Sequence, residues 1–147
     1  SSDLDLTFSI PSARGNERLA MDRVTEAVAP LGLDPRRLEQ LKTAVSEAAM
    51  NAIEHGNGSD PEVPVDLRVH VGDGSLCVAI TDRGGSDALP KPETPDLEAK
   101  LDGRQKTRGW GLFLIRNMVD DVRESSIGDL HTIELVLDLE GDDDAGD

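Results

Sequence analysis

Three polar side chains suited to handling a phosphate share one face of a predicted helix. Glu47, Asn51 and Glu54 follow one another at intervals of four and three residues, so at about 3.6 residues per turn they form one stripe. An asparagine inside a helix gains nothing from propensity, because its amide competes for backbone hydrogen bonds. A carboxylate and an amide oxygen one turn apart could hold a hydrated Mg²⁺ and orient a nucleophile beside a phosphate. An ordinary solvated helix face is the alternative, and this segment alone leaves both open.

A second group of residues follows a predicted strand. Asp82, Gly84 and Gly85 come directly after alternating apolar residues. A short carboxylate followed by glycines lets a flat ligand approach the backbone, and Asp82 could accept a hydrogen bond from an exocyclic amine such as that of adenine. A plain turn is the alternative, because Asp and Gly are favoured in turns for backbone reasons alone.

A third group combines glycine with positive charge. Gly109 and Gly111 precede a predicted helix, and free N–H groups at a helix N-terminus favour anions. The pattern is neither a Rossmann fingerprint, since Leu114 stands where a glycine is required, nor a Walker motif, since Gly-Lys-Ser/Thr is absent from the sequence. The segment around these glycines contains only one acidic residue, Asp102, and five basic residues: Lys100, Arg104, Lys106, Arg108 and Arg116. The alternative interpretation is a chance cluster of charge in a flexible loop.

Composition narrows the class of protein. The 147 residues fit one domain with its own core, and the formal net charge of −15 argues against direct binding of nucleic acid. The sequence contains no run of 18 apolar residues and no signal peptide, so we expect no membrane association. Cys77 is the only cysteine, which excludes a disulfide within the chain and favours the cytoplasm.

Hydrophobic periodicity predicts the elements that must position these groups. We expect helices at about 16–30, with Leu19, Val24, Ala27 and Val28 inward, and at about 35–55, where Asp34 caps the first turn. A further helix follows Gly111, and residues 81–107 form either a lid or a disordered loop, with a short helical turn near 96–101. The strands are expected at 4–10, at 65–71 and 76–80 as a hairpin, from 122, and at 131–139.

These elements predict an α+β fold. It is a two-layer sandwich in which the helices cover one face of a mixed, mostly antiparallel sheet. We expect one domain over residues 1–140, followed by an acidic, disordered tail over residues 141–147.

The order of the three groups resembles that of the histidine-kinase-like (GHKL, Bergerat-fold) ATPases, over about Leu4 to Leu139. Within that superfamily the chain is most similar to bacterial anti-sigma-factor serine/threonine kinases. The stretch from Glu47 to Gly56, which includes Asn51 and His55, resembles their N-box, and Asp82-Arg-Gly84 resembles their adenine motif. The stretch from Gly109 to Asp120 resembles their glycine box and the helix after it.

The resemblance implies a role for each matching residue. Glu47 would be the general base for an attacking hydroxyl, and Asn51 would coordinate a Mg²⁺ that bridges the phosphates of ATP. Asp82 would bind the adenine amine, with Thr132 supporting it through water, and Gly84 would let the base lie close. The phosphates would be wrapped by Arg108, Gly109, Trp110, Gly111 and Leu112.

The sequence also departs from the family pattern at the edge of the expected pocket. Ser86 stands where the adenine motif has another glycine, and Leu130 and His131 stand where a glycine and a threonine usually precede Thr132. These changes leave open how tightly ATP is bound, whereas the retained Glu47 favours an active enzyme.

The resemblance implies a cytoplasmic kinase that phosphorylates an anti-sigma-factor antagonist with Mg-ATP and otherwise holds a sigma factor. It also implies a homodimer. The alternative is a non-catalytic ATP-binding or protein-interaction module of the same fold in a bacterial signalling pathway.

Overall fold

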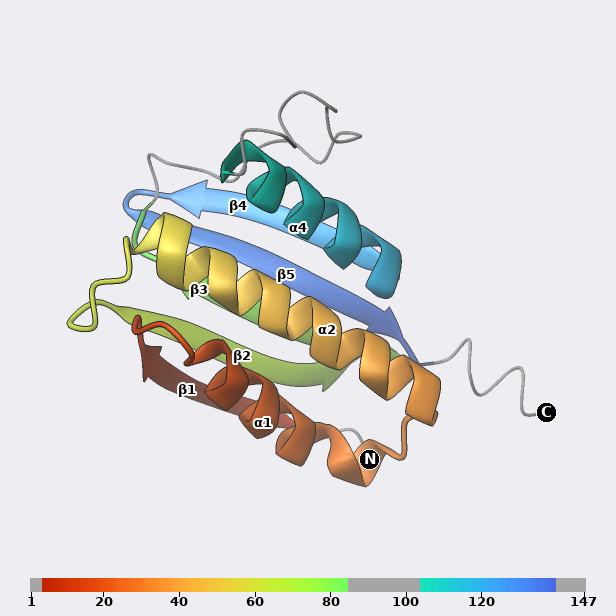
Figure 1. Ribbon diagram of the computed structural model, residues 1–147. Coiled ribbons are helices and arrows are strands. Elements are labelled where there is room, and N and C mark those ends of the chain that lie inside the picture. Colours follow the sequence, from red (N-terminus) through yellow and green to blue (C-terminus); the bar gives the residue numbers. More distant parts are fainter. Residues whose placement is uncertain (1–3, 85–103, 140–147) are drawn as a thin grey trace.

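The computed structural model describes residues 4–84 and 104–139, with side chains described from Gly111 onward in the second range. Within these ranges, three α-helices lie on one face of a five-stranded sheet and form a second layer (Figure 1). The elements in chain order are β1 (Asp5–Pro11), α1 (Glu17–Val28), a 3-10 turn (Ala29–Leu31), α2 (Pro35–Asn51), a π-helical turn (Ala52–Gly56), β2 (Pro64–Gly72), β3 (Ser75–Asp82), α4 (Arg104–Met118), β4 (Asp121–Ile127) and β5 (Leu130–Asp138).

The sheet has the strand order β1-β2-β3-β5-β4, and every pairing between its described strands is antiparallel. The predicted hairpin is present as β2 and β3. Asp73 and Gly74 at its turn have φ values of 54° and 76°, the left-handed pair that a tight two-residue turn requires. The predicted α+β sandwich with helices on one face is therefore confirmed.

Helix α2 crosses the middle of the sheet (Figure 1) and carries Glu47 and Asn51 of the predicted polar stripe, whereas Glu54 lies in the π-helical turn that follows. The Asp34 side chain accepts a hydrogen bond from the Arg36 N–H at 3.1 Å, and Pro35 occupies the first helical position, as predicted. Small side chains on its inner face let the helix lie close to the strands. The buried residues of this face are Leu41, Ala44, Val45, Ala48 and Ala49.

Two predicted details are wrong. Leu19 does not face inward but is 39% exposed, because the buried stripe of α1 is formed by Ala20, Val24 and Val28. Leu19 lies about 100° around the helix from Ala20, the nearest residue of that stripe. The third helix begins at Arg104 and not after Gly111.

Several predictions concern residues that the structure does not describe. Most of the predicted lid, its helical turn near 96–101, Ser86 and the acidic tail at 141–147 lie outside the described ranges. Among the described helices, none has both the length and the apolar character needed to cross a membrane.

Candidate functional site

The polar stripe of α2 meets the glycine-rich helix α4. A Cβ placed on Gly111 would lie 3.1 Å from Glu47 Oε2 and 3.2 Å from Asn51 Nδ2. Asn51 is 1% exposed, yet neither its Oδ1 nor its Nδ2 has a hydrogen-bond partner among the described residues. A buried amide without partners costs about 1–3 kcal/mol, so a polar group retained at this cost is a candidate for ligand binding.

Glu47 lies one turn before Asn51 and is half-buried. Burial raises the pKa of its carboxyl, and the nearby carboxylates of Glu17 and Glu54 raise it further. A carboxylate with a raised pKa is a stronger proton acceptor, which is the property that a general base needs.

The π-helical turn after Asn51 brings α2 against the end of β3. A side chain on Gly56 would overlap the Asp82 carboxylate, and one on Gly84 would overlap the backbone carbonyl of Gly56. Both glycines therefore permit a close approach of two backbone segments, and π-helical turns are frequent at functional sites. The missing side chain of Gly84 therefore makes room for the Gly56 backbone of the protein itself, whereas the family resemblance implies that it makes room for the adenine base.

Asp82 is 4% exposed and both of its oxygens are engaged. Its Oδ1 accepts a hydrogen bond from the Gly84 N–H at 2.9 Å, and its Oδ2 lies 3.1 Å from Nδ1 of His131. The carboxylate is therefore held in one orientation at the end of β3, on the side of the sheet that the helices cover.

His131 is 2% exposed and bridges two carboxylates. Its Nε2 lies 2.6 Å from Glu124 Oε2 on β4, while its Nδ1 faces Asp82. Burial disfavours the imidazolium, but the hydrogen bonds with Glu124 and Asp82 outweigh burial and raise the pKa of His131. Only the protonated ring can donate to both acids.

The prediction that Thr132 supports Asp82 is not met in this structure. In the pairing of β3 with β5, Asp82 lies opposite His131, whereas Thr132 lies opposite Thr81. The Thr132 and Thr81 hydroxyls are 2.7 Å apart, on the face of the sheet away from the helices. Successive side chains of a strand point to opposite faces, so only one of the two neighbours on β5 can reach Asp82. Sequence reasoning did not find the roles of His131 and Glu124, since both depend on strand register.

The glycine box also differs from the prediction. Because α4 begins at Arg104, residues 109–112 lie inside the helix, where N–H groups bond to carbonyls one turn earlier. Leu112 is 3% exposed and packs in the core. Helix-forming residues before the glycines explain the longer helix. The side chains of Arg108 and Trp110, and the surroundings of Gly109, lie outside the described residues.

The donors near Gly111 fit a hydrated magnesium ion. Mg²⁺ prefers oxygen ligands and keeps several waters, and Asn51 Oδ1 and the Glu47 carboxylate offer such oxygens one helical turn apart. The partnerless Asn51 amide is the observation that favours this fit.

The arrangement of a half-buried carboxylate, a partnerless amide and a fixed aspartate agrees with a family match. Residues 10–136 match the sequence profile described as Histidine kinase-like ATPase domain. This chain belongs to the histidine kinase-like ATPase family. The match leaves only nine residues before it and eleven after it, so the family domain is nearly the whole chain.

Individual relatives of this histidine kinase-like ATPase carry informative names. It is 34% identical over 123 residues to the Anti-sigma F factor of Geobacillus stearothermophilus, and the aligned segment covers 82% of this chain and 80% of that protein. It is 31% identical over 122 residues to the Serine-protein kinase RsbW of Oceanobacillus iheyensis, and the aligned segment covers 77% of this chain and 72% of that protein.

The fold of this histidine kinase-like ATPase also matches solved structures. The crystal structure of the RsbU and RsbW domains of Rv1364c from Mycobacterium tuberculosis superposes with a TM-score of 0.66 at 20% identity. The superposition covers 92% of this chain and 32% of that chain. At this identity the likeness concerns the fold alone.

Proposed function

We propose that this histidine kinase-like ATPase is an anti-sigma factor serine/threonine-protein kinase of the cytoplasm. It uses Mg-ATP to phosphorylate an anti-sigma-factor antagonist and thereby regulates a sigma factor by partner switching. The names of its relatives, Anti-sigma F factor and Serine-protein kinase, support this proposal over most of the chain.

The observation that carries the proposal is the contact between α2 and α4. Glu47 and the partnerless Asn51 amide both face Gly111, where the missing side chain leaves room for their polar ends. A structural helix contact would place apolar side chains here. Polar ends retained at such a contact favour a charged ligand.

In the proposed reaction Glu47 accepts the proton of a serine or threonine hydroxyl as its oxygen attacks the terminal phosphorus of ATP. The bond from that phosphorus to the bridging oxygen breaks, and ADP leaves. When bound, Mg²⁺ neutralises charge on the phosphate oxygens, and Asn51 holds it through the amide oxygen.

The end of β3 is the proposed site for the adenine ring. Asp82 accepts a hydrogen bond from the exocyclic amine through a remaining lone pair, and His131 keeps the carboxylate in position. In this role His131 takes over the support that the family resemblance assigns to Thr132.

A neighbouring hollow offers a path for the protein substrate. Glu47 borders a hollow of about 340 Å³ between α1 and α2, which also includes Met21, Lys42 and Ser46. We propose that a hydroxyl-bearing segment of the antagonist reaches Glu47 from this side.

Phosphate transfer tests the proposal directly. The chain is incubated with Mg²⁺, ATP labelled at the terminal phosphate and candidate antagonist proteins encoded nearby, and label is scored on serine or threonine. We expect labelling by the parent chain and much slower labelling by Glu47→Gln.

Thermal unfolding with Mg-ATP separates the kinase from a protein-interaction module that does not bind ATP, and the phosphate-transfer assay separates it from a non-catalytic ATP-binding module. Ligand at about 100 times its dissociation constant stabilises the folded state by about 2.7 kcal/mol. Absence of both label and stabilisation at millimolar Mg-ATP would favour an interaction module of the same fold.

A further inference from the structure

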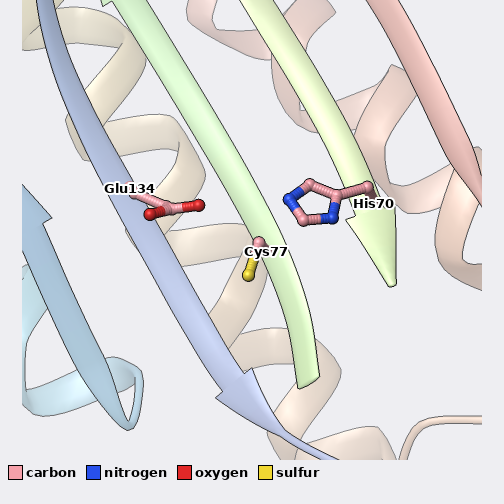
Figure 2. A group of neighbouring side chains, drawn as sticks. All are labelled: His70, Cys77 and Glu134. Carbon is pink, nitrogen blue, oxygen red and sulfur yellow. The ribbon is translucent and has the colours of Figure 1, made fainter. Parts of the chain in front are cut away.

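A second polar cluster lies on the face of the sheet that the helices leave uncovered. His70 on β2, Cys77 on β3 and Glu134 on β5 converge across three neighbouring strands (Figure 2). One nitrogen, one sulfur and one carboxylate oxygen all lie within 4.8 Å of one another. The cluster is separate from the nucleotide site, because Cys77 and Asp82 alternate along β3 and point to opposite faces.

Strand register fixes the three positions. His70 is the direct cross-strand partner of Cys77, and Glu134 is diagonal to Cys77 because it pairs with Ala79. Cys77 is 8% exposed at the base of the cluster, whereas His70 and Glu134 are partly exposed at its sides. Burial raises the pKa of the Cys77 thiol, and the charge of Glu134 raises it further.

The neighbouring cations are engaged by other acids. Arg68 donates two hydrogen bonds to Asp5, each 3.0 Å long, and Arg123 donates to Asp121 at 3.2 Å. Arg123 reaches Glu134 only at 4.0 Å. Glu134 is therefore only weakly paired, through this long contact with Arg123, and a further cation would compete with Arg123 for its carboxylate.

We propose that His70, Cys77 and Glu134 bind a Zn²⁺ ion, with solvent or a further ligand in the fourth position. The donor set favours this choice, because thiolate and imidazole suit Zn²⁺ and Co²⁺, whereas Mg²⁺ and Ca²⁺ take oxygen ligands. On binding, the S–H bond of Cys77 breaks, a sulfur–metal bond forms and the proton passes to solvent. The thiolate and the Glu134 carboxylate then balance the charge of the ion.

The spacing of the donors is compatible with such a site. Metal–ligand bonds of about 2.0–2.3 Å place the donors of one tetrahedral ion about 3.3–3.6 Å apart. The donors must therefore approach by up to about 1.2–1.5 Å from their widest separation, which rotation of the partly exposed His70 and Glu134 side chains provides.

Binding would join strands β2, β3 and β5 through one ion. β3 also carries Asp82 and β5 carries His131, so the ion would stabilise the strands that form the proposed adenine site. The metal site is independent of the proposed kinase reaction, because the three ligands contribute nothing to that reaction.

Titration of Co²⁺ into the reduced chain tests the site. We expect a sulfur-to-cobalt charge-transfer band in the near ultraviolet, visible bands of a tetrahedral ion, and loss of both when Zn²⁺ is added. Cys77 is the only cysteine in the sequence, so the charge-transfer band reports on this thiol alone. We also expect Zn²⁺ to raise the unfolding temperature.

Variants separate a three-ligand site from a lone thiol. Cys77→Ser should remove the charge-transfer band, and His70→Ala and Glu134→Gln should each weaken Co²⁺ binding by about tenfold or more. Asp129→Asn, at an exposed turn carboxylate, is the matched control and should change nothing. If Cys77→Ser does not fold, the other two variants, checked by circular dichroism, decide the question. No band at millimolar Co²⁺, or a band unchanged in both His70→Ala and Glu134→Gln, would overturn the proposal.

Discussion

His131 Nδ1 lies 3.1 Å from Asp82 Oδ2, and this contact joins the ends of β5 and β3 on the helix-covered face of the sheet. The contact is almost fully buried, since the two residues are 2% and 4% exposed. Glu124 holds the other ring nitrogen, so the ring cannot turn without losing a second hydrogen bond. The orientation of the proposed adenine-binding carboxylate therefore depends on a titratable group.

We expect the stability that His131 provides to depend on pH. Its pKa in the folded chain is raised above the unfolded value of about 6.5. The stabilising contribution is therefore complete below the unfolded pKa and is lost as the pH rises through the folded pKa. Thermal unfolding of the parent and His131→Gln from about pH 5.5 to about pH 9 measures it, and the difference between them should shrink with rising pH.

Glu124→Gln is the control for this dependence. It removes one of the two carboxylates that raise the pKa of His131, so the loss of stability should move to lower pH. A difference between parent and His131→Gln that is the same at every pH would show that the charge of His131 does not contribute.

Asn51→Leu should separate stability from ligand binding. It removes a buried amide that has no partner among the described residues and keeps a similar volume, so the free energy of unfolding should stay constant or rise by about 1–3 kcal/mol. Stabilisation by Mg-ATP should disappear. Unfolding in denaturant with and without Mg-ATP measures both the free energy of unfolding and the stabilisation by the ligand.

Asn57→Leu provides the matched control. The Asn57 amide is also buried, but it bonds to Ser12, to the Pro64 carbonyl and to the Arg83 N–H. This substitution should lower the free energy of unfolding by about 1–3 kcal/mol or more. Equal destabilisation in the two variants would argue against an unsatisfied Asn51.

Glu47→Gln should reduce phosphate transfer by a factor on the order of 10²–10⁴ while Mg-ATP still stabilises the chain. In the parent, the transfer rate should rise with pH through the raised pKa of Glu47, because only the carboxylate accepts a proton. Glu26→Gln, at an exposed position of α1 outside the hollow, serves as the control and should keep full activity. Equal rates for Glu47→Gln and the parent would remove Glu47 from the proposed mechanism.

Gly111→Ala should impair transfer without unfolding the chain. Alanine favours the helix over glycine by about 1 kcal/mol, but its Cβ would lie 3.1 Å from Glu47 Oε2. Displacement of the base should lower the transfer rate by a factor on the order of 10–100. Gly72→Ala places its Cβ in open space and should leave the rate unchanged. Normal transfer by Gly111→Ala would show that the site tolerates a side chain at the contact between α2 and α4.

Local patterns in the amino-acid sequence determined most of the fold. Alternating apolar residues predicted the hairpin of β2 and β3, and the Asp34-Pro35 start predicted α2, because turns and caps depend on residues close in sequence. Helical spacing alone placed Glu47 and Asn51 on one face. The composition of these groups pointed to phosphate chemistry.

Tertiary structure decided which groups meet. Register between β3 and β5, strands separated by nearly fifty residues, placed His131 and not Thr132 beside Asp82. The same kind of register brought His70, Cys77 and Glu134 together from three strands. Hydrophobic periodicity within one strand cannot predict such contacts, because they depend on the pairing register between strands. A shift of one residue in that register moves every side chain of a strand to the opposite face.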